Sequence, residues 1–224
     1  NTNGDSTYAY LAEGLGDELR SALYAIPGLS VKARSSSAHV RGKDAREAGA
    51  KLGVGAVVEG TISRSGPLVH VAVELVNVSD ETTLWSGSFD RPAADLQAVQ
   101  ESIVGAIASA LRVNIGTRRS GTAVDITVRG TSDAVAYELF LKGEFFRRRF
   151  DVATALPLLQ QAVAKDSGFA RAHASLAAAI GTLPLIGLSL PDSMRELAAK
   201  SVARALTLAP ALPAAYLAKG ALQF

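Results

Sequence analysis

The C-terminal half of the chain repeats one pattern of small and large residues, and this repetition limits the possible folds more than any other feature. Within Tyr137–Ser167 the pattern has spacings of 3, 9, 4 and 3, at Gly143, Phe146, Ala155, Leu159 and Ala162. Parts of it recur further along, the second half as Ala198, Val202, Ala205 and Pro210 and the first half as His173, Leu176, Ala177 and Ile180. Small residues let two helix backbones approach, and larger ones fill the space beside them. The pattern therefore predicts helical hairpins packed against one another.

This pattern resembles the tetratricopeptide (TPR) repeat, a helix–turn–helix unit of 34 residues. The chain departs from the family at Ser167, where proline is preferred, and in an apolar insertion of about nine residues within Gly181–Asp192. From Pro213 onward we expect only the first helix of a third unit. The resemblance implies a surface that holds another protein, and no reaction.

The composition indicates a folded globular protein and excludes several kinds of site. Of the 224 residues, 48% are hydrophobic and 20% are charged, and the formal net charge is +2. The chain has no cysteine, so disulfides and cysteine metal sites are excluded. Its three histidines, His39, His70 and His173, lie far apart in the sequence. No apolar run approaches the roughly 20 residues of a membrane-spanning helix, and no signal peptide is visible.

The first 55 residues carry helix and turn signals. Apolar residues at helical spacing in Leu11–Ile26 predict a helix, which Pro27-Gly28 ends. Leu29–Arg34 then predicts a short buried strand, and Ser35–Ser37 a turn at its end. A second helix is expected over Asp44–Leu52.

After residue 55 the spacing of the apolar residues changes from a helical period of 3.6 residues to a strand period of 2 residues. This change predicts three strands, Ala56–Arg64, Leu68–Val76 and Thr83–Phe89, joined as an antiparallel meander. Arg91-Pro92 is expected to break the third strand, and Leu96–Leu111 predicts a long amphipathic helix.

A second resemblance covers residues 8–112. Its motifs are Tyr10–Leu15, Glu18-Leu19, Ile26–Val31, Ala33–Ser36, Leu52–Val54, Val58–Gly60 and Leu84-Trp85. Together they resemble the TolB amino-terminal-like domain. In many bacteria this domain precedes TPR repeats in membrane serine/threonine kinases, adenylate cyclases and winged-helix regulators. The family usually opens with an apolar strand, for which Asn1–Thr7 offers no counterpart, and the expected consequence is an unpaired sheet edge.

The two resemblances predict a fold in two parts. Residues 1–115 are expected to form an α/β (α+β) domain, with a small antiparallel meander sheet packed on helices. Residues 116–132 form a linker rich in glycine, threonine and serine, in which Val124–Val128 is an alternative short strand. Residues 133–224 form an all-α, TPR-like array of about two and a half units, with Asp133 as the first helix cap.

No motif of a known catalytic site is present, and we expect no catalytic, cofactor-binding or metal-binding residue. The sequence has no phosphate-binding glycine loop and no nucleophile elbow. Glu13 and Asp17 share a helical face and are an acid/base candidate, but early acids more often face water near the positive end of a helix. Ser35–Ser37 has no neighbouring base, and His70 and Glu74 on one strand face are equally explained as an exposed sheet surface. We therefore predict that the chain is not an enzyme.

One basic and aromatic cluster raises the alternative of nucleic-acid binding. Arg147–Arg149 lies beside Phe145, Phe146 and Phe150, and aromatics with arginines can bind single strands. The favoured interpretation is packing at the end of a repeat helix, so no nucleic-acid partner is expected.

Three sets of residues are candidates for binding a protein or peptide. The first helix of each TPR pair lines the groove, which gives Glu138, Lys142, Phe145, Arg149, Arg171, Ser175 and Ala178. The insertion gives Leu183, Leu185 and Leu188, which either fold over the hairpin or contact a partner. The free end gives Leu217, Leu222 and Phe224. Specificity in such a groove comes from a few anchors and charges.

These observations favour a non-enzymatic interaction or scaffolding module on the periplasmic or extracytoplasmic face of a bacterial membrane. The location follows from the resemblance alone. Two alternatives keep the same fold: a stably bound accessory subunit of a larger membrane complex, and the regulatory region of a kinase or adenylate cyclase whose catalytic domain is absent from these residues.

Overall fold

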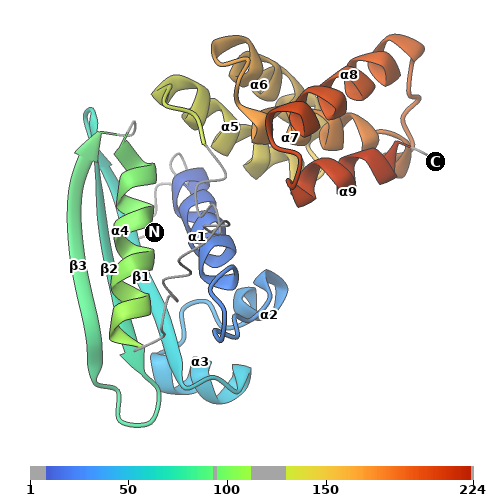
Figure 1. Cartoon of the computed structure of the whole chain (residues 1–224). Helices are drawn as coiled ribbons and strands as arrows, with labels where there is room; N and C mark the ends of the chain where they lie inside the picture. Colours follow the sequence, from blue (N-terminus) through green and yellow to red (C-terminus); the bar gives the residue numbers. More distant parts are fainter. Residues whose placement is uncertain (1–8, 93–94, 112–129, 223–224) are drawn as a thin grey trace, which may run out of the picture. The chain divides into compact units, whose positions relative to one another are not determined.

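A computed structural model of the chain describes residues 9–92, 95–111 and 130–222 (Figure 1). The fold is mixed α/β and mostly helical, as predicted. The chain forms two compact units that divide between Ile126 and Thr127. This division falls within the predicted linker, of which residues 116–129, with the alternative strand, lie outside the described residues.

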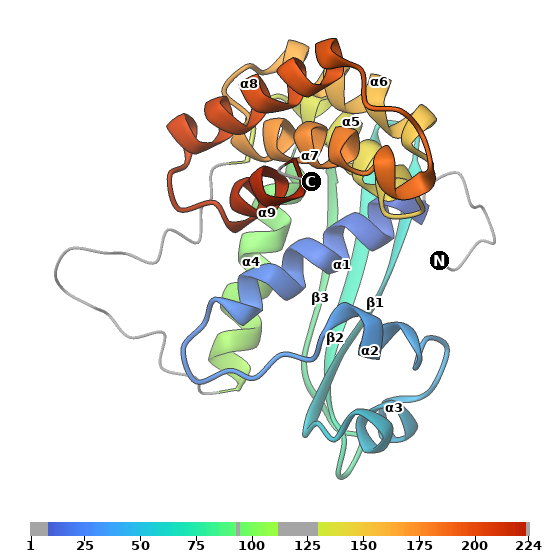
Figure 2. The same ribbon diagram turned by 90° about the vertical axis from the view of Figure 1, so that its right-hand side faces the viewer.

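The first unit contains one sheet and four helices among its described residues. Their bounds are α1 (Ala9–Tyr24), α2 (Arg34–Ala38), α3 (Ala45–Leu52), β1 (Ala56–Ser65), β2 (Leu68–Asn77), β3 (Thr83–Pro92) and α4 (Leu96–Ala110). Helices α1 and α4 lie on the same face of the sheet (Figures 1 and 2). Helix α3 is capped at both ends, since the Asp44 side chain accepts a hydrogen bond from the Glu47 amide and Gly53 ends the helix at φ 62°.

The sheet confirms the predicted antiparallel meander, in the order β1-β2-β3. Ser65 pairs with Leu68 at the hairpin and Ala56 pairs with Asn77 at the far end. The inward face of β2 is buried at every second residue, at Val69, Val71, Val73 and Leu75. Strand β3 continues through Arg91-Pro92, where a break was expected. Proline is tolerated there because β3 is an edge strand of the described sheet.

The prediction of a buried strand at Leu29–Arg34 is wrong. Residues 29–33 have no regular structure, Leu29 and Val31 are only half-buried, and α2 begins at Arg34. The serines Ser35–Ser37 are therefore helical and do not form a turn. A strand needs a neighbour for its backbone groups, and this segment has none among the described strands. Asn1–Thr7, where the sequence lacks the opening strand of the TolB amino-terminal-like family, lies outside the described residues.

Helix α1 buries the predicted face, including Leu11, Leu15, Leu19 and Leu23. A cavity of about 130 Å³ lies between this helix and the β1–β2 ribbon. Gly16 lines the cavity, and a Cβ built on Gly16 meets no atom within 4 Å.

We expect Gly16→Ala to raise the free energy of unfolding by about 0.5–1 kcal/mol, because glycine is the more flexible residue in the unfolded chain and alanine fits without a clash. Urea unfolding measures the change. The matched control is Gly60→Ala, since a Cβ there would lie 2.5 Å from the Ala72 carbonyl oxygen, and this variant should be less stable. A loss of stability in Gly16→Ala would contradict the prediction.

The second unit is entirely helical in its described residues. Its elements are α5 (Ala134–Arg147), α6 (Val152–Lys165), α7 (Ala170–Gly181), the 3₁₀ helix η3 (Pro184–Ile186), α8 (Asp192–Leu208) and α9 (Pro213–Ala221). The predicted cap is confirmed, since the Asp133 carboxylate accepts a hydrogen bond from the Ala136 amide at 2.9 Å. Asp151 caps α6 in the same way, through the Thr154 amide.

Helix α7 is the centre of the second unit (Figure 2). It packs against α5, α6, α8 and α9, and most of its residues are buried. At its start, the fully buried Phe169 ring lies 4.9 Å from the Phe140 ring of α5. A cluster of small and branched apolar residues joins α7 to α8, α9 and the turn between them: Ala170, Ala174, Ala205, Leu212 and Ala215. No helix within the described part of the chain is long and apolar enough to cross a bilayer.

Candidate functional site

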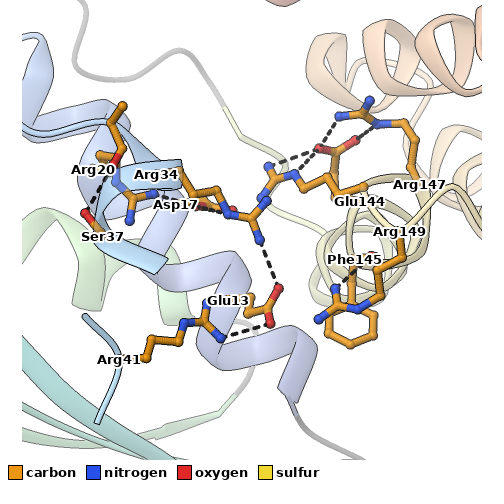
Figure 3. A network of polar contacts seen from close by, with 12 residues as sticks. Glu13, Asp17, Arg20, Arg34, Ser37, Arg41, Glu144, Phe145, Arg147 and Arg149 are labelled. Atoms are coloured by element: carbon orange, nitrogen blue, oxygen red, sulfur yellow. Dashed lines mark hydrogen bonds and ion pairs between the residues drawn. The ribbon is translucent and has the colours of Figure 1, made fainter. Parts of the chain in front are cut away.

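The predicted groove residues of α5 lie along one face of that helix. Lys142 Nζ lies 3.0 Å from the Glu138 carboxylate. One turn further, the Arg149 guanidinium lies 3.5 Å from the centre of the Phe145 ring, and it also donates a hydrogen bond to the Phe145 carbonyl oxygen (Figure 3). The two pairs place both charges and one aromatic ring along this helix.

The predicted groove residues of α7 are less accessible. The Arg171 guanidinium lies 5.1 Å from the Phe140 ring, which links α7 to α5. Ala178 is half-buried, and Ser175 is only 8% exposed. Of these three residues, Ser175 is the least available to a ligand.

The arginine run at the end of α5 has a carboxylate partner, Glu144, which was not predicted from the sequence although it stands three and four residues before Arg147 and Arg148. Arg147 binds the buried Glu144 through two hydrogen bonds of 2.6 and 2.9 Å, and Arg148 Nε lies 3.2 Å from the same carboxylate (Figure 3). Burial lowers the pKa of Arg147, but the hydrogen bond and charge of Glu144 outweigh it, so the pKa is raised. With Arg149 stacked on Phe145, all three arginines of the run have intramolecular partners, as the packing interpretation requires.

Glu13 and Asp17 do not face water, contrary to expectation. Their side chains are only 12% and 11% exposed and are paired with arginines. Arg34 lies 3.0 Å from Glu13 and 3.2 Å from Asp17, and Arg41 lies 3.3 Å from Glu13 (Figure 3). The pairing attaches α2 and the following turn to α1, since α2 has no buried residue of its own.

Asp17 has a further partner on its own helix, Arg20, at 2.5 Å. Burial and the charges of Arg34 and Arg41 lower the pKa of Arg20. The spacing of three between Asp17 and Arg20 was visible in the sequence. Arg34 and Arg41 come from a segment without a periodic pattern, so nothing in the sequence placed them here.

The remaining polar candidates are dispersed. His70 Nδ1 lies 2.8 Å from the Asp90 carboxylate on the neighbouring strand, and Glu74 is exposed. In the described residues, no three histidine, aspartate or glutamate side chains are placed to hold a metal ion.

Large apolar side chains are exposed on the α7–α8 connection and on α9. Leu185 and Leu188 are 78% and 54% exposed, whereas Leu183 is buried at 9%. On α9, Leu217 is 76% exposed. Leu222 is half-buried, and Phe224 lies outside the described residues. One leucine of the insertion therefore lies in the core and two are exposed to solvent.

No family model matches the chain. Among curated proteins, one of Rhizobium meliloti (strain 1021), named "Putative adenylate cyclase 3", is 30% identical to it over 181 residues. The aligned region covers 79% of this chain and 30% of that protein. The chain therefore spans less than a third of the length of this relative.

Proposed function

We propose that the chain is a non-enzymatic module that binds another protein, with a TolB amino-terminal-like first unit and a TPR-like second unit. Two structural features support the second assignment. Consecutive helices from α5 to α9 pack against one another. The repeat residues Ala155, Leu159 and Ala162 are fully buried in the unit.

The observation that carries the proposal is the exposure of the leucines Leu185, Leu188 and Leu217, whose side chains are more than half exposed. Removing apolar surface from water is favourable by about 25 cal/mol per Å², so covering these side chains would be favourable. Exposed apolar patches on folded proteins mark sites of contact with other molecules. A bound protein would cover these side chains.

The candidate acids support the non-enzymatic part of the proposal. A general base needs a lone pair directed at its substrate. Glu13 is held by Arg34 and Arg41, and Asp17 by Arg20 and Arg34. The pairs with Arg34 and Arg41 join α1 to α2 and the turn that follows it.

We expect the double variant Leu185→Asp, Leu188→Asp to bind its partner at least tenfold more weakly, since removing an apolar anchor typically costs more than 1 kcal/mol of binding energy. The partner is first recovered from the native membrane fraction at physiological salt and identified by mass spectrometry. Its affinity is then measured with purified components. The thermal midpoint should be unchanged, because both side chains are exposed.

Ser189→Asp is the matched control, because it adds a charge to the same exposed connection without removing an apolar side chain. It should bind as the unaltered chain does. Unchanged binding by a folded double variant would contradict the proposal, and unfolding would show that the connection belongs to the core. Recovery of a stoichiometric membrane complex would instead favour the accessory-subunit alternative.

A second candidate is favoured by the Rhizobium meliloti relative: the chain corresponds to a regulatory region of an adenylate cyclase. Support comes from the extent of the match, which leaves about 70% of that protein outside the aligned region. The test deletes the aligned region from the relative and measures formation of cyclic AMP from ATP. We expect the rate to change without being abolished, and the isolated chain to form no cyclic AMP. Cyclic AMP formed by the chain alone would overturn the non-enzymatic assignment.

A further inference from the structure

Three helices of the second unit meet at one carbonyl oxygen, that of Ser167 in the α6–α7 turn. His173 Nε2 of α7 lies 3.1 Å from this oxygen, and Arg204 Nε of α8 donates to it at 3.3 Å. We call these three residues the Ser167 junction. It fastens the end of α6 to both α7 and α8.

The hydrogen bond fixes the state of the His173 ring. A carbonyl oxygen only accepts, so Nε2 carries the proton and Nδ1 carries a lone pair. His173 is 8% exposed, and its Nδ1 is buried without a hydrogen-bond partner in the described part of the chain. A proton added at Nδ1 would therefore create a buried cation whose new N–H group has no acceptor.

The surroundings of the ring do not compensate that charge. The charged groups that act on it are Arg204 of α8, which opposes protonation, and Asp166 at the end of α6, which favours it. The cluster where α7 meets α8, α9 and their connecting turn is apolar. Burial has the largest effect and lowers the pKa of His173 below its ordinary value. The Ser167 carbonyl and Asp166 counteract this effect in part, and Arg204 adds to it.

We propose that the Ser167 junction is acid-sensitive: neutral His173 fits its buried position on α7, whereas protonated His173 places an uncompensated charge and an unpaired Nδ1–H group there. Because α7 contacts all the other α-helices of its unit, a less stable first turn of α7 weakens the packing of α6 and α8 against it. This inference goes beyond the proposed function. Its test measures stability and protonation, so it can fail or succeed independently of partner binding.

The sign of the effect follows from linkage. The folded chain binds a proton at His173 less readily than the unfolded chain, in which the pKa is about 6.5. The full stability is therefore present above about pH 6.5 and is lost as the pH falls toward the pKa of the folded state. In this window the ratio of unfolded to folded second unit should rise by up to tenfold per pH unit.

The test is urea unfolding between pH 7.5 and pH 5.0, followed by far-UV circular dichroism, on the unaltered chain and on His173→Gln. Glutamine keeps an N–H donor and does not titrate, so this variant should lack the acid-dependent loss assigned to His173. His39→Gln and His70→Gln are matched controls in the first unit and should retain the loss. An identical pH profile for His173→Gln and the unaltered chain would overturn the proposal.

A second measurement decides the question even if His173→Gln does not fold. Titration of the His173 imidazole ring of the unaltered chain by NMR should give a pKa below the ordinary value for histidine, about 6.5. A pKa of His173 at or above that value would refute the acid-sensitive junction.

Discussion

Replacing Phe169 by alanine is expected to lower the free energy of unfolding of the second unit by about 3–5 kcal/mol. The Phe169 side chain is fully buried where α7 begins, and its ring lies 4.9 Å from Phe140. The substitution removes the transfer energy of the ring and leaves a cavity between α5 and α7 that the surrounding helices cannot fully close. Because a domain of this size is stable by about 5–15 kcal/mol, the loss is a large share of the total.

Phe150 provides the matched control for Phe169. It is 61% exposed and adopts a φ of 60° at the end of α5. Its ring contributes little to the core, and a left-handed backbone favours glycine. Phe150→Gly should therefore leave stability unchanged or raise it. A loss for Phe150→Gly as large as that for Phe169→Ala would show that ring burial is not the cause.

The single tryptophan allows the two units to be followed separately. Trp85 lies on β3 of the first unit, so its fluorescence reports on that unit, whereas far-UV circular dichroism reports on the helices of both units. In Phe169→Ala part of the circular dichroism transition should move to lower denaturant concentration, while the Trp85 midpoint should stay in place. Equal shifts of both signals would show that the two units unfold as one.

Local signals predicted much of the fold. The change of period from 3.6 to 2 located β1 and β2 almost to the residue, since alternation of buried and exposed positions is set by the strand itself. The cap at Asp133 was also predicted. This cap depends on a side chain and an amide three residues away, which a sequence shows directly.

Contacts distant in the sequence could not be predicted in this way. The Arg34–Glu13 pair spans 21 residues and the Arg41–Glu13 pair spans 28. Neither spacing has a local geometric meaning, because the chain between them turns through an irregular segment. The same segment misled the prediction of a strand at Leu29–Arg34, where apolar residues are not accompanied by a partner strand.

The candidate surface was predicted in part. The repeat pattern identified the α5 face, because residues spaced by four and three share one side of a helix. The pattern contained no information on which insertion leucines are buried. Leu183 lies just beyond the end of α7 and packs inward, while Leu185 and Leu188 lie beyond it on a connection that leaves the core. Which of these leucines is buried depends on the three-dimensional path of the chain.

The second large effect is expected at Gly143, where α5 packs directly against Leu159 of α6. A Cβ built on Gly143 would lie 2.6 Å from Leu159 Cγ and 2.7 Å from Leu159 Cδ2. Overpacking of this kind costs about 1–3 kcal/mol, and alanine recovers about 1 kcal/mol of helix propensity. Gly143→Ala should therefore lose up to about 2 kcal/mol of unfolding free energy, and Gly143→Val about 3 kcal/mol, since valine adds volume.

A double variant tests whether the contact with Leu159 causes the loss of stability in Gly143→Ala. Leu159→Ala alone should cost about 2–5 kcal/mol, but it removes the atoms that Gly143→Ala would strike. In the Leu159→Ala background, Gly143→Ala should therefore change sign and stabilise by up to about 1 kcal/mol through helix propensity. This matches the sign expected for Gly16→Ala, where no atom opposes the new methyl group. If Gly143→Ala were equally destabilising in both backgrounds, the small residue would not be required by the helix seam, and the packing basis of the repeat would be wrong.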